Sequence, residues 1–398
     1  MSRRSAFLSM AFSCVAHSYS HFFQPIFFVV VLALENDLGL THGDTVTLIW
    51  VGTFLFGVAA PLAGWLGDRW SSIGMIALFF FGTGGGMVMV GFAETPFMIG
   101  MGLAVTGLFA SIYHPVGMAW LVRNAANRGT ALGINGMFGG FGPAAAALMS
   151  GAFIDLFGWR AAFITPGVAV VLTGVVFVYL IATKQVVEAK EDRKIDPPAT
   201  RSDTTRVIGV LALTMLCNGL IYQATQAGLP KLFSERIVDF TAQGAFGIST
   251  MVAVVYGSAG VLQIIAGRLA DRYPLKTVYQ LAFFMQIVML ALVSQLGGVA
   301  LLIAAILMAA SNSGTLPPEN CLVARYTPSR RRGLAYGLKF VVALGFGSLG
   351  IKLEGMLFDA TGGFTMLFGV LACLALTATL VAFLLPSDHK EPAAVPAE

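Results

Sequence analysis

The stretch Gly64-Trp-Leu-Gly-Asp-Arg69 recurs about 200 residues later as Gly267-Arg-Leu-Ala-Asp-Arg272. Nearly the same interval separates Arg128-Gly-Thr-Ala-Leu-Gly133 from Arg332-Gly-Leu-Ala-Tyr-Gly337. Matching motifs that keep their order along the chain indicate two copies of one structural unit. The sequence therefore predicts a fold made of two related halves.

Composition indicates where this duplicated unit resides. Of the 398 residues, 57% are hydrophobic and only 11% are charged, whereas soluble domains carry roughly 25% charged residues. Apolar stretches long enough for the ~20 residues that cross a bilayer as a helix recur throughout, and short alternating β-barrel segments do not. We expect an all-α membrane protein with twelve transmembrane helices, at approximately 7–34, 45–67, 72–92, 96–122, 129–154, 160–183, 206–231, 244–266, 275–296, 298–322, 333–357 and 364–385.

One long polar segment, 184–206, divides these spans into two sets of six. It predicts a linker between an N-terminal six-helix bundle at 1–183 and a C-terminal bundle at 207–386, with a tail at 387–398. Most of the 24 basic residues fall in loops on the side of the termini, so both termini are expected in the cytoplasm. Asp155 and Asp359 occupy matching positions in the two halves.

The two repeated motifs fall in tight turns after the second and eighth predicted spans. Glycine permits close helix approach there, and aspartate can pair with arginine or meet a helix N-terminus. One copy of the motif alone would be equally compatible with a solvated turn. Two equivalent copies favour a contact that breaks and reforms between conformations. The expected gating residues are Gly64, Asp68, Arg69 and Arg128, with Gly267, Asp271, Arg272 and Arg332 in the second copy.

These turns resemble the signature of the major facilitator superfamily, and Gly158-Trp159-Arg160-Ala-Ala-Phe163 resembles another of its elements. The resemblance implies two six-helix bundles, a transport function and a cell membrane location, in a bacterium the inner membrane. The first copy departs from the family after Arg69, where Trp70-Ser71-Ser72 replaces glycine and basic residues. Gly139-Gly140-Phe141-Gly142-Pro143 is similar to the family's antiporter motif, although plain helix packing also explains it. His114-Pro115 is similar to fosmidomycin-resistance transporters.

Polar residues inside apolar spans indicate a cavity or a relay, because burying them in lipid is costly. The first span carries His17, His21 and Gln24 on one helical face, and the seventh carries Asn218, Tyr222 and Gln226. Both faces are expected to point to one central place; plain hydrogen bonding between helices is the alternative. A metal site is not expected, because no third ligand lies beside the two histidines on their helix.

Prolines beside polar residues predict interruptions in the fourth and tenth spans, at Tyr113-His114-Pro115 and Pro317-Pro318-Glu319-Asn320. Lys339 matches Asn135 in the repeat, and it is the expected charge partner of Glu319. Lys352 and Glu354 are expected to reach water or to pair with each other, without a functional role. Proton coupling is expected at His21, His114 or Glu319, because burial and nearby charges shift such groups.

Transport driven by an ion gradient is the favoured function. The sequence lacks catalytic motifs such as H-E-x-x-H, G-x-S-x-G or a phosphate loop, so no enzyme activity and no cofactor are expected. We expect proton-coupled efflux of a small organic solute by a monomer in the lipid bilayer, without nucleic acid. The alternatives are an uptake symporter and a receptor or assembly factor that transports nothing. The four cysteines, all inside predicted spans, are expected to be buried and unpaired.

Overall fold

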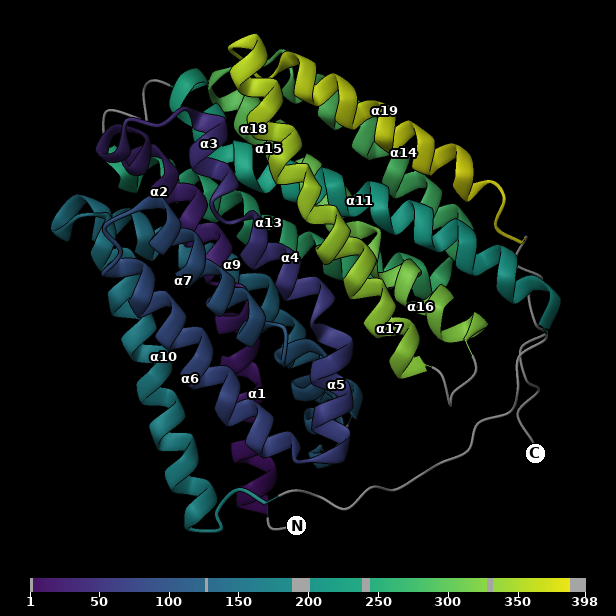
Figure 1. The fold of residues 1–398 in the computed structure, drawn as a ribbon. Coiled ribbons are helices and arrows are strands. Elements are labelled where there is room, and N and C mark those ends of the chain that lie inside the picture. The colour runs from purple at the N-terminus through teal and green to yellow at the C-terminus, as the bar shows by residue number, and fades with distance from the viewer. Residues whose placement is uncertain (1–2, 126–127, 188–200, 238–243, 328–331, 387–398) are drawn as a thin grey trace.

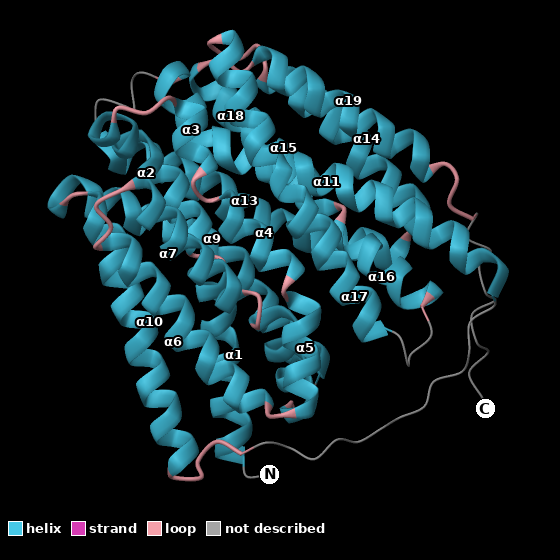
Figure 2. Cartoon of the chain, in the orientation of Figure 1, coloured by secondary structure: helices cyan, strands magenta, loops and turns pink. Residues whose placement is uncertain are grey.

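The computed structural model describes residues 3–125, 128–187, 201–237, 244–327 and 332–386. We call residues 3–187 the N-half and residues 201–386 the C-half. Every regular element in these described ranges is a helix, as Figure 2 shows, and no strand occurs among them.

In the N-half the elements are α1 (Arg3–Ser20), α2 (Phe23–Leu38), α3 (His42–Thr47), α4 (Trp50–Val58), α5 (Ala60–Arg69), α6 (Ser72–Gly91), α7 (Pro96–Ala110), the π-helical turn η1 (Tyr113–Gly117), α8 (Met118–Asn124), α9 (Arg128–Phe157) and α10 (Trp159–Ala182). In the C-half they are α11 (Arg201–Arg236), α13 (Gly244–Arg272), α14 (Leu275–Val293), α15 (Gly298–Gly314), α16 (Leu316–Tyr326), α17 (Arg332–Phe340), η3 (Val341–Gly345), η4 (Phe346–Ser348), α18 (Leu349–Thr361) and α19 (Thr365–Ala382).

These elements join into membrane-length helices. Eleven of the described helices are long and apolar enough to cross a bilayer. A twelfth crossing results if His42–Val58 and Ala60–Arg69, which meet at a bend of 43°, form one span. With this bent pair included, the twelve predicted spans are all found, each within a few residues of its expected position.

Several spans are interrupted where the sequence removes a backbone hydrogen bond. Pro115 lies inside η1, and Pro317 and Pro318 follow the break between α15 and α16, as predicted. Pro143 behaves differently, because α9 continues through it without a break. The first predicted span is also not one continuous helix, since it breaks between Ser20 and Phe23.

The two halves pack together most closely at one end of the molecule. In Figure 1, α3 lies beside α18 at the top, and the halves diverge toward the lower edge, where α10 and the start of α11 lie on opposite sides. We call the end with α3 and α18 the far end, and the opposite end, where α1 begins and α10 ends, the terminal end. α9 and α13 also pack together across the two halves.

Glycines allow the helices of the two halves to approach at backbone distance. A Cβ at Gly57 of α4 would lie 2.0 Å from the backbone nitrogen of Gly345 in η3. At the far end, a Cβ at Gly355 of α18 would lie 2.7 Å from Cα of Gly43 in α3. Larger side chains at these positions would hold the halves apart, so these glycines are required for the observed closure.

Candidate functional site

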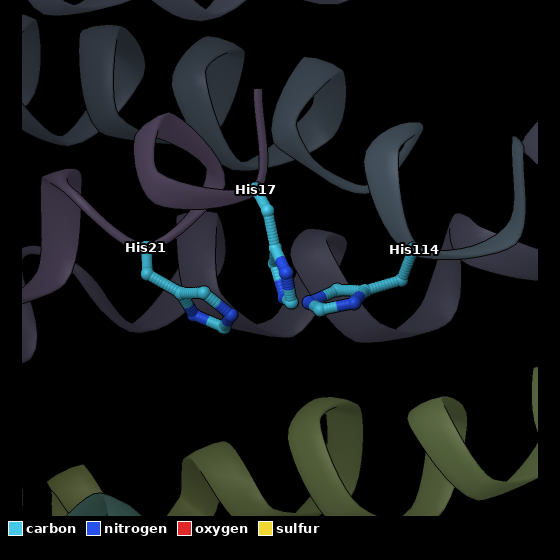
Figure 3. Close-up of side chains that lie close together, drawn as sticks. All are labelled: His17, His21 and His114. Carbon is cyan, nitrogen blue, oxygen red and sulfur yellow. The ribbon is translucent and has the colours of Figure 1, made fainter. Parts of the chain in front are cut away.

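Three histidines from two separate spans meet in the middle of the N-half. His17 is near the end of α1, His21 lies in the break before α2, and His114 belongs to η1. Their ring centroids are 5.1 to 5.4 Å apart, and Figure 3 shows the three rings pointing toward one another. We call these three residues the histidine cluster. The break in the first span therefore directs His21 toward a residue from a different span.

The histidine cluster is positioned by a buried polar network. The Nδ1 atom of His17 lies 2.8 Å from the backbone oxygen of Asn135, so Nδ1 carries the proton and donates it. The Asn135 amide donates to the Tyr113 hydroxyl at 2.8 Å, and the Tyr113 ring stacks on His17. Asn135 is fully buried. The structure brings together four residues that were predicted separately, from the polar face of the first span, the interruption of the fourth span and a repeat position: His17, Tyr113, His114 and Asn135.

The cluster also reaches the C-half. The ring of Phe340, at the end of α17, stacks on His114 with a centroid distance of 4.8 Å. Phe56 of α4 covers His21 and His114. The immediate neighbours of the histidine cluster are therefore largely aromatic, and one of them, Phe340, belongs to the opposite half.

Beside Phe340, Lys339 forms the predicted ion pair with Glu319. The Nζ atom of Lys339 lies 2.8 Å from Oε1 of Glu319 and donates to Oδ1 of Asn320 at 2.6 Å. The hydroxyl of Tyr279 lies 2.9 Å from the other carboxylate oxygen of Glu319. Glu319 is 1% exposed and Lys339 is 8% exposed. The prediction that these two charges pair inside the bundle is confirmed.

The residues of the predicted polar face of the seventh span do not meet at one central place, because they contact different parts of the C-half. Asn218 of α11 donates to Thr315 and accepts from Asn312 within the C-half. Tyr222 and Gln226 bond to each other and line a small cavity between α11, α13 and α15. The residue of α11 that bonds to Gln24 of the N-half is instead Gln223, at 3.0 Å.

A second polar cluster closes the far end. Nδ1 and Nε2 of His42 lie 2.6 Å from Glu35 and 2.8 Å from Glu354, and Lys231 donates to Glu35 at 2.6 Å. Glu35 and His42 belong to the N-half, whereas Lys231 and Glu354 belong to the C-half. We call these four residues the far-end cluster. It joins the two halves through a fully buried carboxylate, that of Glu354.

The expectation that Lys352 and Glu354 pair with each other is therefore wrong, and so is the expectation that Glu354 reaches water. Glu354 is buried and bonds to His42, while Lys352 lies over the ring of Trp50 at 3.6 Å. The two residues follow each other at a spacing of two along a helix, which directs their side chains to different faces.

The repeated aspartates lie at the same far end. Asp155 of α9 accepts hydrogen bonds from the backbone of Ala245 and Phe246 at the start of α13. Asp359 of α18 accepts from the backbone of Gly43 at the start of α3. Each aspartate thus meets the N-terminus of a helix in the opposite half, where negative charge is favoured.

The predicted gating turns lie at the terminal end and are open to solvent. Asp68, Arg69, Asp271 and Arg272 are exposed, and within the described ranges the aspartates form no pair with arginine. A Cβ at Gly64 would lie 3.1 Å from Pro115, but one at Gly267 would contact nothing within 4 Å. Close approach is therefore found for the first glycine only. The side chains of Arg128 and Arg332 lie outside the described residues.

Sequence reasoning missed the far-end cluster entirely. Glu35, His42 and Lys231 lie at span ends, where charged residues ordinarily face water. The sequence did contain a signal for this cluster: Glu35, Lys231 and Glu354 lie near the ends of predicted spans on the same side of the membrane. Of the cysteines, Cys14 and Cys217 are buried as expected, whereas Cys321 and Cys373 are exposed.

Comparisons with known proteins agree with this architecture. The chain matches the family profile described as the Major Facilitator Superfamily over residues 6–257 and again over residues 211–398. The Fosmidomycin resistance protein of Escherichia coli (strain K12) is 27% identical over 169 residues, which span 42% of this chain and 40% of that protein.

Solved structures share the fold over nearly the whole chain. The D-xylose-proton symporter superposes with a TM-score of 0.77 and 12% identity, covering 96% of this chain and 99% of its own. A bacterial homologue of the human lysosomal transporter Spinster, in an inward-facing and unoccupied conformation, superposes with a TM-score of 0.74 and 14% identity. That match covers 97% of this chain and 95% of the homologue.

Proposed function

Because the chain belongs to the major facilitator superfamily of membrane transporters, we propose that it exports a small organic solute in exchange for protons by alternating access. The moving bodies are the predicted bundles at 1–183 and 207–386, joined by the linker at 184–206. The solute site lies between them, near the histidine cluster and Gln24. The single observation that carries proton coupling is the buried pair of Glu319 and Lys339.

Glu319 is the proposed proton site. A carboxylate inside a membrane-spanning bundle is costly unless it is paired or protonated. Its partner Lys339 directly precedes Phe340, which contacts His114 of the other half, so movement of the halves alters the surroundings of the pair. Pairing with Lys339 and binding of a proton are then the two alternatives by which the buried Glu319 carboxyl group is accommodated in the bundle.

The far-end cluster is the proposed outer gate. With both termini in the cytoplasm, as the distribution of basic residues favours, the far end faces the outside. Contacts between the halves at the far end, and their divergence at the terminal end, support an inward-facing conformation. The turns that contain Asp68 and Asp271 then form the inner gate, which is open in this conformation.

Two observations support export. The relative from Escherichia coli is named for resistance to fosmidomycin, and the glycine-proline stretch at 139–143 resembles an antiporter motif. The alternative is uptake together with protons, as the name of the D-xylose-proton symporter describes for a protein with the same fold. Both directions use the same two-bundle movement.

Flux in proteoliposomes tests this proposal, with fosmidomycin and a panel of small organic solutes as probes. An acidic interior drives accumulation by an antiporter, because protons leave as solute enters, whereas an alkaline interior drives accumulation by a symporter. Glu319→Gln should abolish accumulation driven by a pH gradient while solute exchange at equal pH continues. The matched control is Glu94→Gln, at an exposed carboxylate. Unchanged pH-driven accumulation by Glu319→Gln would reject Glu319 as the proton site.

A further inference from the structure

The histidine cluster has the donor set of a metal site. One ring nitrogen from each of His17, His21 and His114 lies within 4.8 Å of the other two. These nitrogens come from a helix end, an interhelical break and a π-helical turn (Figure 3). The third ligand, absent from the helix that carries His17 and His21, is therefore supplied by another span.

The hydrogen bonds leave the ligand atoms free. Because Nδ1 of His17 donates to the backbone oxygen of Asn135, its Nε2 atom keeps a lone pair. This arrangement, in which a histidine donates its other ring N–H to a carbonyl, is typical of metal ligands. Nε2 of His114 is buried and has no hydrogen-bond partner among the described residues. A buried nitrogen without a partner is costly, and a metal ion among the three rings would satisfy it.

We propose that His17, His21 and His114 bind one late first-row transition-metal dication, such as Zn²⁺ or Co²⁺. Three neutral imidazoles with a fourth position open to water or an anion form an established zinc ligand set. Metal–nitrogen bonds of about 2.0–2.1 Å place tetrahedral ligand nitrogens about 3.4 Å apart. The side chains would therefore close by about 1 Å or slightly more. His21 lies outside regular helix, so its position can adjust.

The surroundings disfavour three protonated rings. Phe56 and Phe340 cover the histidine cluster, and burial of imidazolium ions among aromatic side chains is costly without a counter-ion. Glu319, an acidic group of this region, is already paired with Lys339. Neutral imidazole is the form that ligates a metal. Since Phe340 belongs to the C-half, an ion held here would lie where the two halves meet.

Metal binding to the purified full-length protein tests this inference. The protein is prepared in detergent without a polyhistidine tag and titrated with Co²⁺, whose four-coordinate form absorbs visible light much more strongly than its hydrated form. Isothermal titration with Zn²⁺ gives the stoichiometry. Wild type should bind one equivalent and show the four-coordinate spectrum. His114→Gln and His17→Gln should each lower the affinity by about 100-fold or more.

Two histidine variants serve as controls. His389→Gln alters the tail, outside the described residues, and should leave binding unchanged. His42→Gln tests whether the metal binds at the far-end cluster instead. This variant should also retain the four-coordinate Co²⁺ spectrum. A Cys321→Ser and Cys373→Ser double variant removes the exposed thiols as competing ligands.

Each outcome decides for or against the site. The inference is overturned if wild type binds no metal, if only a hydrated Co²⁺ spectrum appears, or if binding disappears with His42→Gln or the thiol variant but survives His114→Gln. If His114→Gln fails to fold, judged by size-exclusion chromatography, His21→Gln and His17→Gln decide by the same criteria. This measurement requires no flux, so its failure is distinguishable from a failure of the proposed transport function.

Discussion

Replacing Gly355 by alanine should open the far end. The new Cβ would lie 2.7 Å from Cα of Gly43, whereas ordinary contact begins at 3.4 Å. Cγ1 of Val46 would lie 2.9 Å from the new Cβ as well. Because the nearest atom belongs to the backbone of a packed helix, α3 and α18 must separate by about 0.7 Å. The bond between His42 and Glu354, now 2.8 Å, would then stretch to about 3.5 Å, the limit for a hydrogen bond.

The energetic consequence follows from these distances. Overpacking of this kind costs about 1–3 kcal/mol, and the cost falls on the conformation in which the far end is closed. Alanine also stabilises the helix itself by about 1 kcal/mol relative to glycine in either conformation, so the protein should still fold. The ratio of open to closed far ends should therefore rise by about 5- to 150-fold.

The assay is a distance measurement between spin labels at the exposed positions Asn36 and Ala360, in a background without the four native cysteines. Gly355→Ala should shift the distance distribution to longer values. Gly369→Ala is the matched control, because it makes the same change in the same half at a position with nothing within 4 Å. A distribution for Gly355→Ala that matches wild type, in protein with unchanged thermal stability, would refute the reasoning.

Three further predictions concern single side chains. Lys339→Ala should lower the free energy of unfolding by about 3–5 kcal/mol because it leaves the buried Glu319 carboxyl group without its ion partner, and the Lys339→Met, Glu319→Gln double variant should recover most of it in thermal unfolding. Trp50→Ala should lower the free energy of unfolding by about 0.5–2 kcal/mol in the same assay, because it removes the ring beneath Lys352. Lys352→Arg should leave the free energy of unfolding nearly unchanged. His42→Gln should raise the rate at which a cysteine introduced between the halves at the far end is alkylated. An unchanged rate would exclude His42 from the gate.

Local features of the sequence were sufficient to predict the spans and the breaks beside Pro115 and Pro317, but not the break between Ser20 and Phe23. A bilayer of fixed thickness demands ~20 apolar residues in a row, and this pattern is visible without any tertiary information. Prolines at 115, 317 and 318 lack the backbone N–H that a regular helix needs, so the interruptions follow from residue chemistry. Glu319 and Lys339 could be paired because the repeat placed both in facing spans of the same half.

Contacts between distant spans could not be derived in the same way. His42 and Glu354 are 312 positions apart, and their pairing depends on how two bundles meet. Helical periodicity placed Gln226 on the same face as Tyr222, but the orientation of α11 within the bundle decides that Gln223 contacts Gln24. His114 joined the histidine cluster through the packing of η1 against α1, which no local pattern specifies.

The repeat distinguishes the far-end contacts that occur in both halves from those that occur on one side only. Asp155 and Asp359 are equivalent in the two halves, and each meets the start of a helix in the other half, so these contacts form a symmetric pair of anchors. The far-end cluster has no such symmetry, because Phe246 and Ser150 occupy the positions that match His42 and Glu354. At the far end, the ion pairs between the halves that the described residues form therefore lie on the side of α3 and α18. We infer that the far-end cluster, together with the Asp359 contact to Gly43, determines when α3 and α18 part.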